Sequence, residues 1–451
     1  MKRIVILGAG KSSPVLIDFL LAEAHSRGWK VAVGDLDPAA AAARIGEHPS
    51  GESFAFDVHD AGARRKQVET ADLVVSLLPP ALHALVAEDC IASKVHFASA
   101  SYVGDDMRQL SEAAERAGVI LLNEMGVDPG IDHMSAMAKL DELREQGATI
   151  TRFETFTGGL VAPHCDDNPW RYKFTWNPRN VVLAGQGGVK FKHNGRYKYI
   201  PYHRLFRRFE PLSIPGYGDF EGYPNRDSLK YRGHYGLWDV DTIYRGTLRR
   251  PGFCKAWDCL VQLGLTDDSY ELEDLGQLTY RDYVNSYLWY DPDSSVELKL
   301  RAYLKLELND PEFDQIKWLG LFEDTPIGLS RGTPAQVLQR KLEEKWGMAK
   351  DDQDMIAMLH KTEYVLDGRR EEVQSSMVCL GDDSVRTAMA KTVGLPLAVG
   401  ALRVLDGTIQ RRGVVIPTVQ DVYEPVLAEL GKHGIEFTDR TAAIDKPGRS
   451  A

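Results

Sequence analysis

The beginning of the chain alternates apolar, glycine-rich and amphipathic stretches in an order that few folds accommodate. An apolar run over residues 3–7 breaks at once into Gly8-Ala9-Gly10-Lys11-Ser12-Ser13, and an amphipathic stretch over 15–24 follows. A second apolar run over 30–34 then ends on Asp35. A strand, a tight turn, a helix and a second strand form a βαβ unit, whose strands are parallel.

Four further apolar runs continue this pattern to about residue 125. Amphipathic stretches such as 81–92 separate them, and they occupy residues 53–57, 72–77, 96–98 and 119–122. Runs of Ile, Val and Leu without polar alternation are typical of strands buried on both faces, as in a doubly wound sheet. We therefore predict an α/β fold with an N-terminal Rossmann domain.

The turn after the first strand has the composition that a dinucleotide pyrophosphate requires. Gly8 and Gly10 allow a tight turn and a close approach of the backbone, although Ser13 replaces the third glycine of the usual fingerprint. Free N–H groups at the start of the next helix attract the phosphate charge. The cofactor contacts predicted here are Gly8, Ala9, Gly10, Lys11 and Ser12.

Asp35 ends the second strand, where a carboxylate accepts hydrogen bonds from the adenosine ribose. The same charge repels a 2′-phosphate, so the sequence predicts NAD as the preferred cofactor, with NADP as the alternative. Another interpretation is that Asp35 only opens a turn in which Asp37 caps the next helix. The loops after strands three and four line the same crevice, which adds Asp57, Val58 and Leu78 as predicted cofactor contacts.

The composition excludes several function classes. A net charge of −11 over 451 residues argues against nucleic-acid binding, which needs a basic face. The five cysteines are scattered without a CxxC pair, so neither a disulfide framework nor a metal site is expected. No stretch approaches the roughly 20 apolar residues of a membrane span, and the first apolar run is too short for a signal sequence. We therefore expect a cytoplasmic protein that acts on a small molecule.

The character of the chain changes after about residue 131, and 451 residues exceed what one hydrophobic core usually organises. A helix over 131–145 and a strand over 149–157 lead into an aromatic- and arginine-rich region, whose short strand-like pieces predict a separate mixed sheet. Helical periodicity dominates from about 266 to 360. No internal repeat or low-complexity linker is present, so we expect discontinuous domains with the chain returning to an earlier sheet.

The best-marked helix of this second part begins after Thr333, with Pro334 at its first position and Gln336 at its third. The remaining predicted elements are strands over 363–366 and 373–379 and helices over 385–393 and 396–405, the two helices closed by Gly394 and Gly407.

The loop over 123–133 has the composition of a binding site. It places Asp128 and His133 among two glycines and a proline, and it follows the sixth strand at the carboxyl edge of the sheet, where ligands bind in open α/β folds. The other interpretation is a domain-crossing turn in which Asp128 caps the following helix. The two interpretations are compatible.

Three arginine-containing segments, 168–179, 223–228 and 244–249, lie among turn residues and aromatics rather than on periodic helix faces. A planar guanidinium such as that of Arg226 or Arg249 can bind a carboxylate through two hydrogen bonds. A single arginine is more often part of a surface ion pair of little energetic weight. Three such segments beside a Rossmann unit favour a substrate with several carboxylates.

Several segments together carry a pattern more specific than the glycine turn. They are Ser101-Tyr102-Val103, 123–133, Gly158-Gly159-Leu160, 168–179, 223–228, 245–249, 405–409 and 412–414. With them the chain resembles the saccharopine dehydrogenase family of the L-glutamate-forming kind along nearly its whole length. The resemblance implies a Rossmann domain over 1–127 completed by about 395–451, a mixed α/β substrate domain over 128–265 and 361–394, and a helical domain over 266–360.

Enzymes of this family interconvert saccharopine with glutamate and 2-aminoadipate 6-semialdehyde by hydride transfer through an imine. Imine chemistry needs proton transfer, for which Tyr102 and Asp128 are the catalytic candidates, with His133 or a held water also open. The resemblance also implies a cofactor contact at Trp176. The substrate contacts that it implies are Ser101, Tyr102, Asp128, Arg226, Thr247, Leu248 and Arg249.

The chain departs from the family pattern at two positions. Thr157 stands where many relatives have a cysteine, which removes any role of that cysteine here. Leu36 stands where biosynthetic fungal enzymes carry an arginine for the 2′-phosphate of NADP. Together with Asp35 this predicts NAD preference and an oxidative, lysine-degrading direction.

Two other functions remain open at this point. One is a carboxynorspermidine-type polyamine reductase with the same imine chemistry, which would need fewer arginines and more anionic groups for its amine tail. The other is a dinucleotide-binding relative without catalysis, since fold alone does not prove activity. We also expect a homodimer, with neither nucleic acid nor membrane as a partner.

Overall fold

The computed structural model describes residues 1–444, and the chain forms two compact units. Unit 1 contains residues 1–150 and the chain from 364 onward, and unit 2 contains residues 151–363. The finer three-domain division expected from the sequence stays a prediction, and its last seven residues, 445–451, lie outside the described part.

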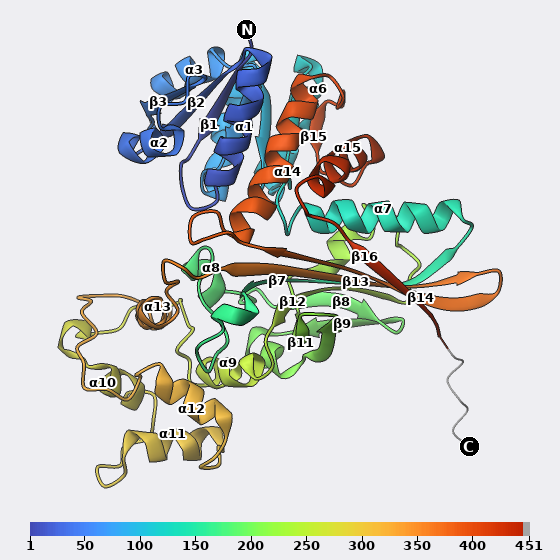
Figure 1. Cartoon of the computed structure of the whole chain (residues 1–451). Helices are drawn as coiled ribbons and strands as arrows, with labels where there is room; N and C mark the ends of the chain where they lie inside the picture. The colour runs from blue at the N-terminus through green and yellow to red at the C-terminus, as the bar shows by residue number, and fades with distance from the viewer. Residues whose placement is uncertain (445–451) are drawn as a thin grey trace. The chain divides into compact units, whose positions relative to one another are not determined.

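A parallel sheet of seven strands forms the centre of unit 1 (Figure 1). The strands are β1 (Arg3–Leu7), β2 (Lys30–Asp35), β3 (Gly51–Ala55), β4 (Leu73–Ser76), β5 (His96–Ser99), β6 (Ile120–Leu122) and β15 (Gly413–Val415). Their order is β15-β6-β5-β4-β1-β2-β3, and every neighbouring pair is parallel. The doubly wound sheet is thus confirmed, and the order reverses between β1 and β4, where such sheets bind ligands.

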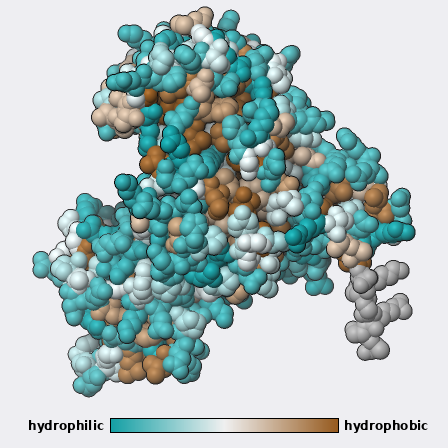
Figure 2. Space-filling model, viewed as in Figure 1, coloured by the Kyte–Doolittle hydropathy of each residue, from teal (hydrophilic) through white to brown (hydrophobic). Residues whose placement is uncertain are grey.

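Burial explains why the strand sequences lack polar alternation. Ile4, Val5 and Ile6 of β1 are inaccessible to solvent, as are Val74 and Val75 of β4. Helices cover the sheet, and hydrophilic residues dominate the face of the molecule shown in Figure 2. Continuous apolar runs are therefore what this sheet requires.

Nine helices of unit 1 lie within the described residues. They are α1 (Pro14–Arg27), α2 (Pro38–Ile45), α3 (Ala61–Glu69), α4 (His83–Ser93), α5 (Asp105–Gln109), α6 (Ser111–Ala117), α7 (Ile131–Glu145), α14 (Ala388–Leu405) and α15 (Gln420–Gly431). Strands β14 (Arg369–Leu380) and β16 (Thr438–Ala443) form an antiparallel pair in the same unit. Since β15 joins β6 and α14 packs against α1, the C-terminal part returns to the first sheet, as expected.

Helix α14 corrects the prediction of two helices separated at Gly394. It runs without a break through Gly394 and Pro396, and it lies beside α1 in Figure 1. A Cβ atom at Gly394 would meet the backbone nitrogen of Leu16 at 2.9 Å, so the glycine permits close helix packing instead of ending the helix. By length and composition α14 could cross a membrane, whereas we expected no stretch close to a membrane span. However, 83% of its apolar window is buried within the structure.

Unit 2 contains the predicted mixed sheet. Its strands are β7 (Thr149–Val161), β8 (Val189–His193), β9 (Arg196–Ile200), β10 (Glu210–Ile214), β11 (Gly218–Pro224), β12 (Thr242–Arg249) and β13 (Asp354–Leu366). The order is β10-β11-β12-β7-β13, with β8 paired to β12 and β9. The β12–β7 pair is parallel, whereas β10–β11 and β11–β12 are antiparallel.

The helices of unit 2 include those of the predicted helical region. They are α8 (Pro178–Val182), α9 (Phe253–Gln262), α10 (Tyr280–Asn285), α11 (Val296–Leu304), α12 (Pro311–Trp318) and α13 (Pro334–Lys345). The cap of α13 is confirmed, since Thr333 and Gln336 exchange side chain–backbone hydrogen bonds of 3.3 and 2.8 Å. Helical structure to residue 360 was wrong: residues 354–360 belong to β13, whose apolar residues are buried on both faces.

Candidate functional site

The glycine turn of unit 1 has the shape and the donors that a pyrophosphate needs. Gly8 has φ 108°, and a Cβ there would lie 3.3 Å from Leu77, so a side chain at this position would be strained. The space above Gly10 is open, with nothing within 4 Å of a Cβ. Buried Ser13 donates its hydroxyl to the Gly10 carbonyl at 2.8 Å. Within the described chain, no acceptor takes the backbone N–H groups of Gly10, Lys11 and Ser12.

Asp35 ties the end of β2 to this turn. Its Oδ2 atom accepts from the Ala9 N–H at 2.7 Å, and its Oδ1 atom accepts from the Asp37 N–H at 2.9 Å. Asp37 in turn caps α2 by accepting from the Ala39 N–H at 2.9 Å. Asp35 therefore opens the turn, as the second interpretation requires, and its contact with the adenosine ribose stays a prediction. The neighbouring Leu36 side chain is 77% exposed.

The other predicted cofactor contacts follow strands of the same sheet. Asp57 lies after β3 and accepts from the His59 N–H at 2.9 Å, and the carbonyl of buried Val58 accepts a hydrogen bond from Arg64 at 2.6 Å. Half-buried Leu78 lies after β4. The glycine turn, Asp35 and these loops share the carboxyl edge of the sheet, and their donors and open space fit a dinucleotide. Their individual roles stay predictions.

The substrate loops predicted in unit 1 meet through a short hydrogen bond. The Tyr102 hydroxyl donates to Oδ1 of Asp128 at 2.6 Å. Behind this pair, Glu124 accepts from the Val103 N–H at 3.0 Å and contacts Nε2 of His133 at 2.9 Å. His133 is completely buried, and its part in proton transfer stays a prediction.

Arg249 is a buried charged group of unit 2. It is 4% exposed, and its guanidinium lies 4.9 Å from the ring centre of Tyr172 and 5.3 Å from that of Phe253. It donates to the Leu248 carbonyl at 2.9 Å, but its Nε atom has no partner, and no carboxylate of the described chain pairs with it. Burial raises the pKa of Tyr172, which stays neutral beside it.

The position of Arg249 is fixed by strand pairing. Its register partner on β11 is Glu221, whose carboxylate accepts from the N–H groups of Gly252 and Cys254 at 2.8 and 2.9 Å. Because a buried charge without a counter-charge is costly, an arginine in this position is suited to receive an anionic ligand group.

The remaining predicted residues of unit 2 lie along the same two strands or beside them. Arg226 is exposed just after β11, with φ 51°, and Thr247 pairs with Tyr223 in the β11–β12 register. The register separates Arg226 from Arg249 by about five residues, or roughly 17 Å of strand. Leu248 is fully buried, and its contact with a substrate stays a prediction. Trp176 is half-buried before α8.

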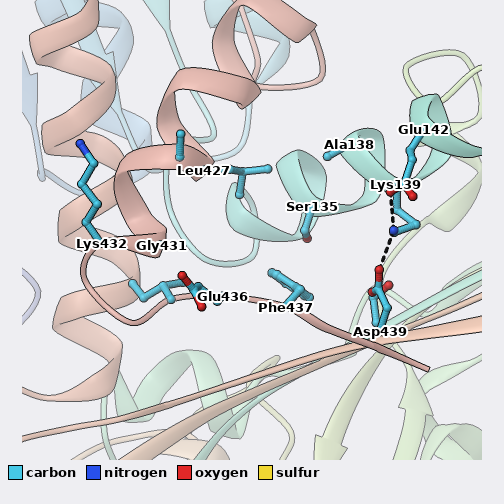
Figure 3. Close-up of a pocket in the computed structure, with 13 residues that line it drawn as sticks. Ser135, Ala138, Lys139, Glu142, Leu427, Gly431, Lys432, Glu436, Phe437 and Asp439 are labelled. Atoms are coloured by element: carbon cyan, nitrogen blue, oxygen red, sulfur yellow. Dashed lines mark hydrogen bonds and ion pairs between the residues drawn. The ribbon is translucent and has the colours of Figure 1, made fainter. Parts of the chain in front are cut away.

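A pocket of about 580 Å³ lies elsewhere in unit 1, among α7, α15, β14 and the segment before β16 (Figure 3). Lys139 at its wall is paired with Glu142 and, at 2.6 Å, with Asp439. None of the predicted site residues lines this pocket, and the lysine charge is already compensated. No group of three or more His, Cys, Asp or Glu residues that could hold a metal occurs among residues 1–444.

Two protein-family models together match most of the chain. Residues 4–122 match a family model described as the saccharopine dehydrogenase NADP binding domain, and residues 126–435 match the saccharopine dehydrogenase C-terminal domain. The chain belongs to the saccharopine dehydrogenase family. The resemblance seen in the sequence is thereby confirmed.

Individual relatives and a solved structure support this family assignment. The chain is 34% identical to the saccharopine dehydrogenase [NADP(+), L-glutamate-forming] of Schizosaccharomyces pombe, over 97% of this chain and 99% of that protein. It is also 34% identical to the mitochondrial alpha-aminoadipic semialdehyde synthase of Bos taurus, over 98% of this chain but 48% of the relative. The solved structure of the apo L-Glu-forming saccharopine dehydrogenase of Saccharomyces cerevisiae matches with a TM-score of 0.90 and 31% identity, over 98% and 100% of the two chains.

Sequence reasoning did not single out His83, although it lies at the same edge of the sheet. This residue starts α4 and forms hydrogen bonds with Ser76 and Ser101 at 2.9 and 2.8 Å. The available signal was its position at the start of the helix that follows a parallel strand, close to the edge where ligand-binding groups of such folds gather.

Proposed function

We propose that this chain is an NAD(P)-dependent saccharopine dehydrogenase of the L-glutamate-forming kind. It would interconvert saccharopine, water and oxidised cofactor with glutamate, 2-aminoadipate 6-semialdehyde, reduced cofactor and a proton. The observation that carries this proposal is the 34% identity to the fission-yeast enzyme over nearly the full length of both chains. When bound, the nicotinamide accepts or supplies the hydride.

The buried guanidinium of Arg249 supports a carboxylated substrate. It has aromatic neighbours and no carboxylate partner in the described chain, so a substrate carboxylate would supply the missing counter-charge. Arg226, roughly 17 Å away along the strands, suits a second carboxylate. Carboxynorspermidine carries a single carboxylate and would need fewer arginines, so two arginines favour saccharopine over the polyamine reductase function.

In unit 1 we assign the orienting and proton-handling roles to the linked loops. Asp128 would bind an ammonium group of the substrate, with Tyr102 holding the carboxylate in position or exchanging a proton with the reacting nitrogen. Ser101 would contact the substrate beside them. Thr247 and the backbone of Leu248 would line the carboxylate site around Arg249.

We further propose that NAD is preferred over NADP. Asp35 holds a carboxylate next to the turn, and the adjacent Leu36 offers no positive charge for a 2′-phosphate. The family model and the fission-yeast relative are both described by NADP, so the comparison of the two cofactors is the decisive measurement. A clear NADP preference in kcat/KM would contradict the role given to Asp35.

The function is tested by following saccharopine-dependent formation of reduced cofactor by absorbance. We expect turnover with saccharopine and none with carboxynorspermidine, and Arg226→Ala should raise the KM for saccharopine. Cofactor binding without turnover of either substrate would show a non-catalytic relative instead. We also propose the oxidative direction and the three-domain division. We further propose a cytoplasmic location, which cell fractionation tests, and a homodimer, which light scattering tests.

A further inference from the structure

His83 bridges two hydroxyl groups at the carboxyl edge of the unit 1 sheet. Its Nδ1 atom lies 2.9 Å from Oγ of Ser76, the last residue of β4, and its Nε2 atom lies 2.8 Å from Oγ of Ser101. Ser76 and His83 are 1% and 4% exposed, whereas Ser101 is half-buried. The imidazole therefore connects the interior of the sheet to a predicted substrate contact.

The ring of His83 carries a single N–H group at neutral pH. Burial lowers the pKa of His83 to about 4, and the opposing effect of Asp106 is smaller. A neutral imidazole donates from one nitrogen and accepts at the other. It must therefore donate to one serine and accept from the other.

The buried serine decides which nitrogen carries the proton. Within the described chain, Nδ1 of His83 is the one hydrogen-bonding partner of the Ser76 hydroxyl. If Nδ1 carried the proton, Ser76 would accept and its own hydrogen would be buried without an acceptor, which is unfavourable. Ser76 thus donates to Nδ1, and the proton of the ring lies on Nε2, which donates to Ser101.

This direction determines what Ser101 can recognise. Its Oγ atom accepts from His83, and no acceptor among residues 1–444 takes its hydroxyl hydrogen. We propose that His83 is a positioning residue that, as the Nε2–H tautomer, makes the Ser101 hydroxyl a hydrogen-bond donor to a carboxylate of the substrate. This inference rests on the proposed function, in which Ser101 contacts saccharopine.

The tautomer can be measured without any activity assay. In the full chain labelled with ¹⁵N-histidine, the His83 signals are identified by their loss in His83→Asn. At pH 7 we expect a protonated Nε2 and an unprotonated Nδ1, and Ser76→Ala should weaken this preference. A protonated Nδ1 in the wild-type chain would overturn the proposal.

Two amide replacements separate the two sides of the ring in kinetics. In His83→Gln the amide N–H can take the place of Nε2–H, so kcat/KM for saccharopine should stay within about threefold of wild type. In His83→Asn the amide reaches towards Ser76 only, so kcat/KM should fall about tenfold, as for a lost hydrogen bond to a charged group. The KM for the cofactor should stay within about twofold in both variants.

The Ser101→Ala background tests whether His83 acts through Ser101. There His83→Asn should cause no further loss, and equal losses in both backgrounds or equal losses for Gln and Asn would overturn the proposal. If wild type turned over no saccharopine, the proposed function would fail, whereas the tautomer measurement would still report on His83.

Discussion

The Tyr102 hydroxyl donates a 2.6 Å hydrogen bond to Oδ1 of Asp128, joining the loop after β5 to the loop after β6. A bond this short to a carboxylate is typical of a charge-assisted pair. The two residues were predicted as catalytic candidates separately, and the structure brings them into direct contact. They should therefore act as one unit in kinetics.

A double-mutant cycle tests this pair. We expect Tyr102→Phe and Asp128→Asn each to lower kcat/KM for saccharopine about 10- to 100-fold, with the double variant within about threefold of the weaker single variant. If the losses of kcat/KM in the two single variants multiplied in the double variant, the two residues would have independent roles. Tyr423→Phe is the matched control, since Tyr423 donates to Asp141 at 2.8 Å in the same unit, outside the predicted site; its kcat/KM should equal that of wild type.

Asp35 offers a test of cofactor choice that separates its charge from its support of the turn. Asp35→Asn keeps an oxygen acceptor for the Ala9 N–H but removes the charge that repels a 2′-phosphate. The ratio of kcat/KM for NADP to that for NAD should rise about tenfold or more. Asp35→Ala should shift the ratio similarly while raising the KM for both cofactors, because the turn loses its acceptor. An unchanged ratio in Asp35→Asn would contradict the role of the carboxylate.

Adjacent arginines provide a matched pair for the carboxylate site. Arg249→Met should raise the KM for saccharopine about 100-fold, as expected for the loss of a bidentate charged contact. Its free energy of unfolding should stay within about 1 kcal/mol of wild type or rise, since an uncompensated buried charge is removed. Substrate saturation curves and denaturant unfolding measure the two effects. A strong loss of stability without a change in KM would make Arg249 structural.

Arg250→Met is expected to show the opposite pattern. Arg250 donates to the Tyr217 and Asp219 carbonyls at 2.7 and 3.4 Å and stacks 4.5 Å from the ring centre of Phe220. Its loss leaves these carbonyls without their donor and should lower the free energy of unfolding by about 1–3 kcal/mol, with the KM for saccharopine unchanged.

These two arginines also illustrate what the sequence alone can predict. The βαβ start, the strands of the first sheet and the cap at Thr333 follow from neighbouring residues, and the structure confirms them. Arg249 and Arg250 are adjacent in the sequence, both are buried, and the Nε atom of each has no partner. Only their other hydrogen-bond partners distinguish the proposed ligand-binding arginine from the structural one. Such partners are set by strand pairing between distant segments.

The errors in secondary structure have similar causes. Gly394 is typical of a helix end, but its role depends on contact with Leu16 in another helix. The buried run over 354–360 has no clear periodicity, so a strand and a buried helix segment could not be separated from the sequence. His83 was missed because its partners, Ser76 and Ser101, are brought to it by the sheet.

His83 also predicts a specific loss of stability in acid. Its folded-state pKa of about 4 lies below the ordinary 6.5, so between these values the unfolded chain binds a proton that the folded chain does not. The contribution of His83 to stability is fully present above about pH 6.5 and is lost as the pH falls towards 4. Between pH 7 and pH 5 this amounts to about 2 kcal/mol for one group.

Denaturant unfolding at several pH values checks this expectation by comparing wild type with His83→Gln. Glutamine does not titrate, so the variant should lose about 2 kcal/mol less than wild type from pH 7 to pH 5. The comparison cancels the contribution of His96, whose pKa is also lowered by burial. Parallel curves for the two proteins would mean that His83 takes up its proton in the folded state near its ordinary pKa.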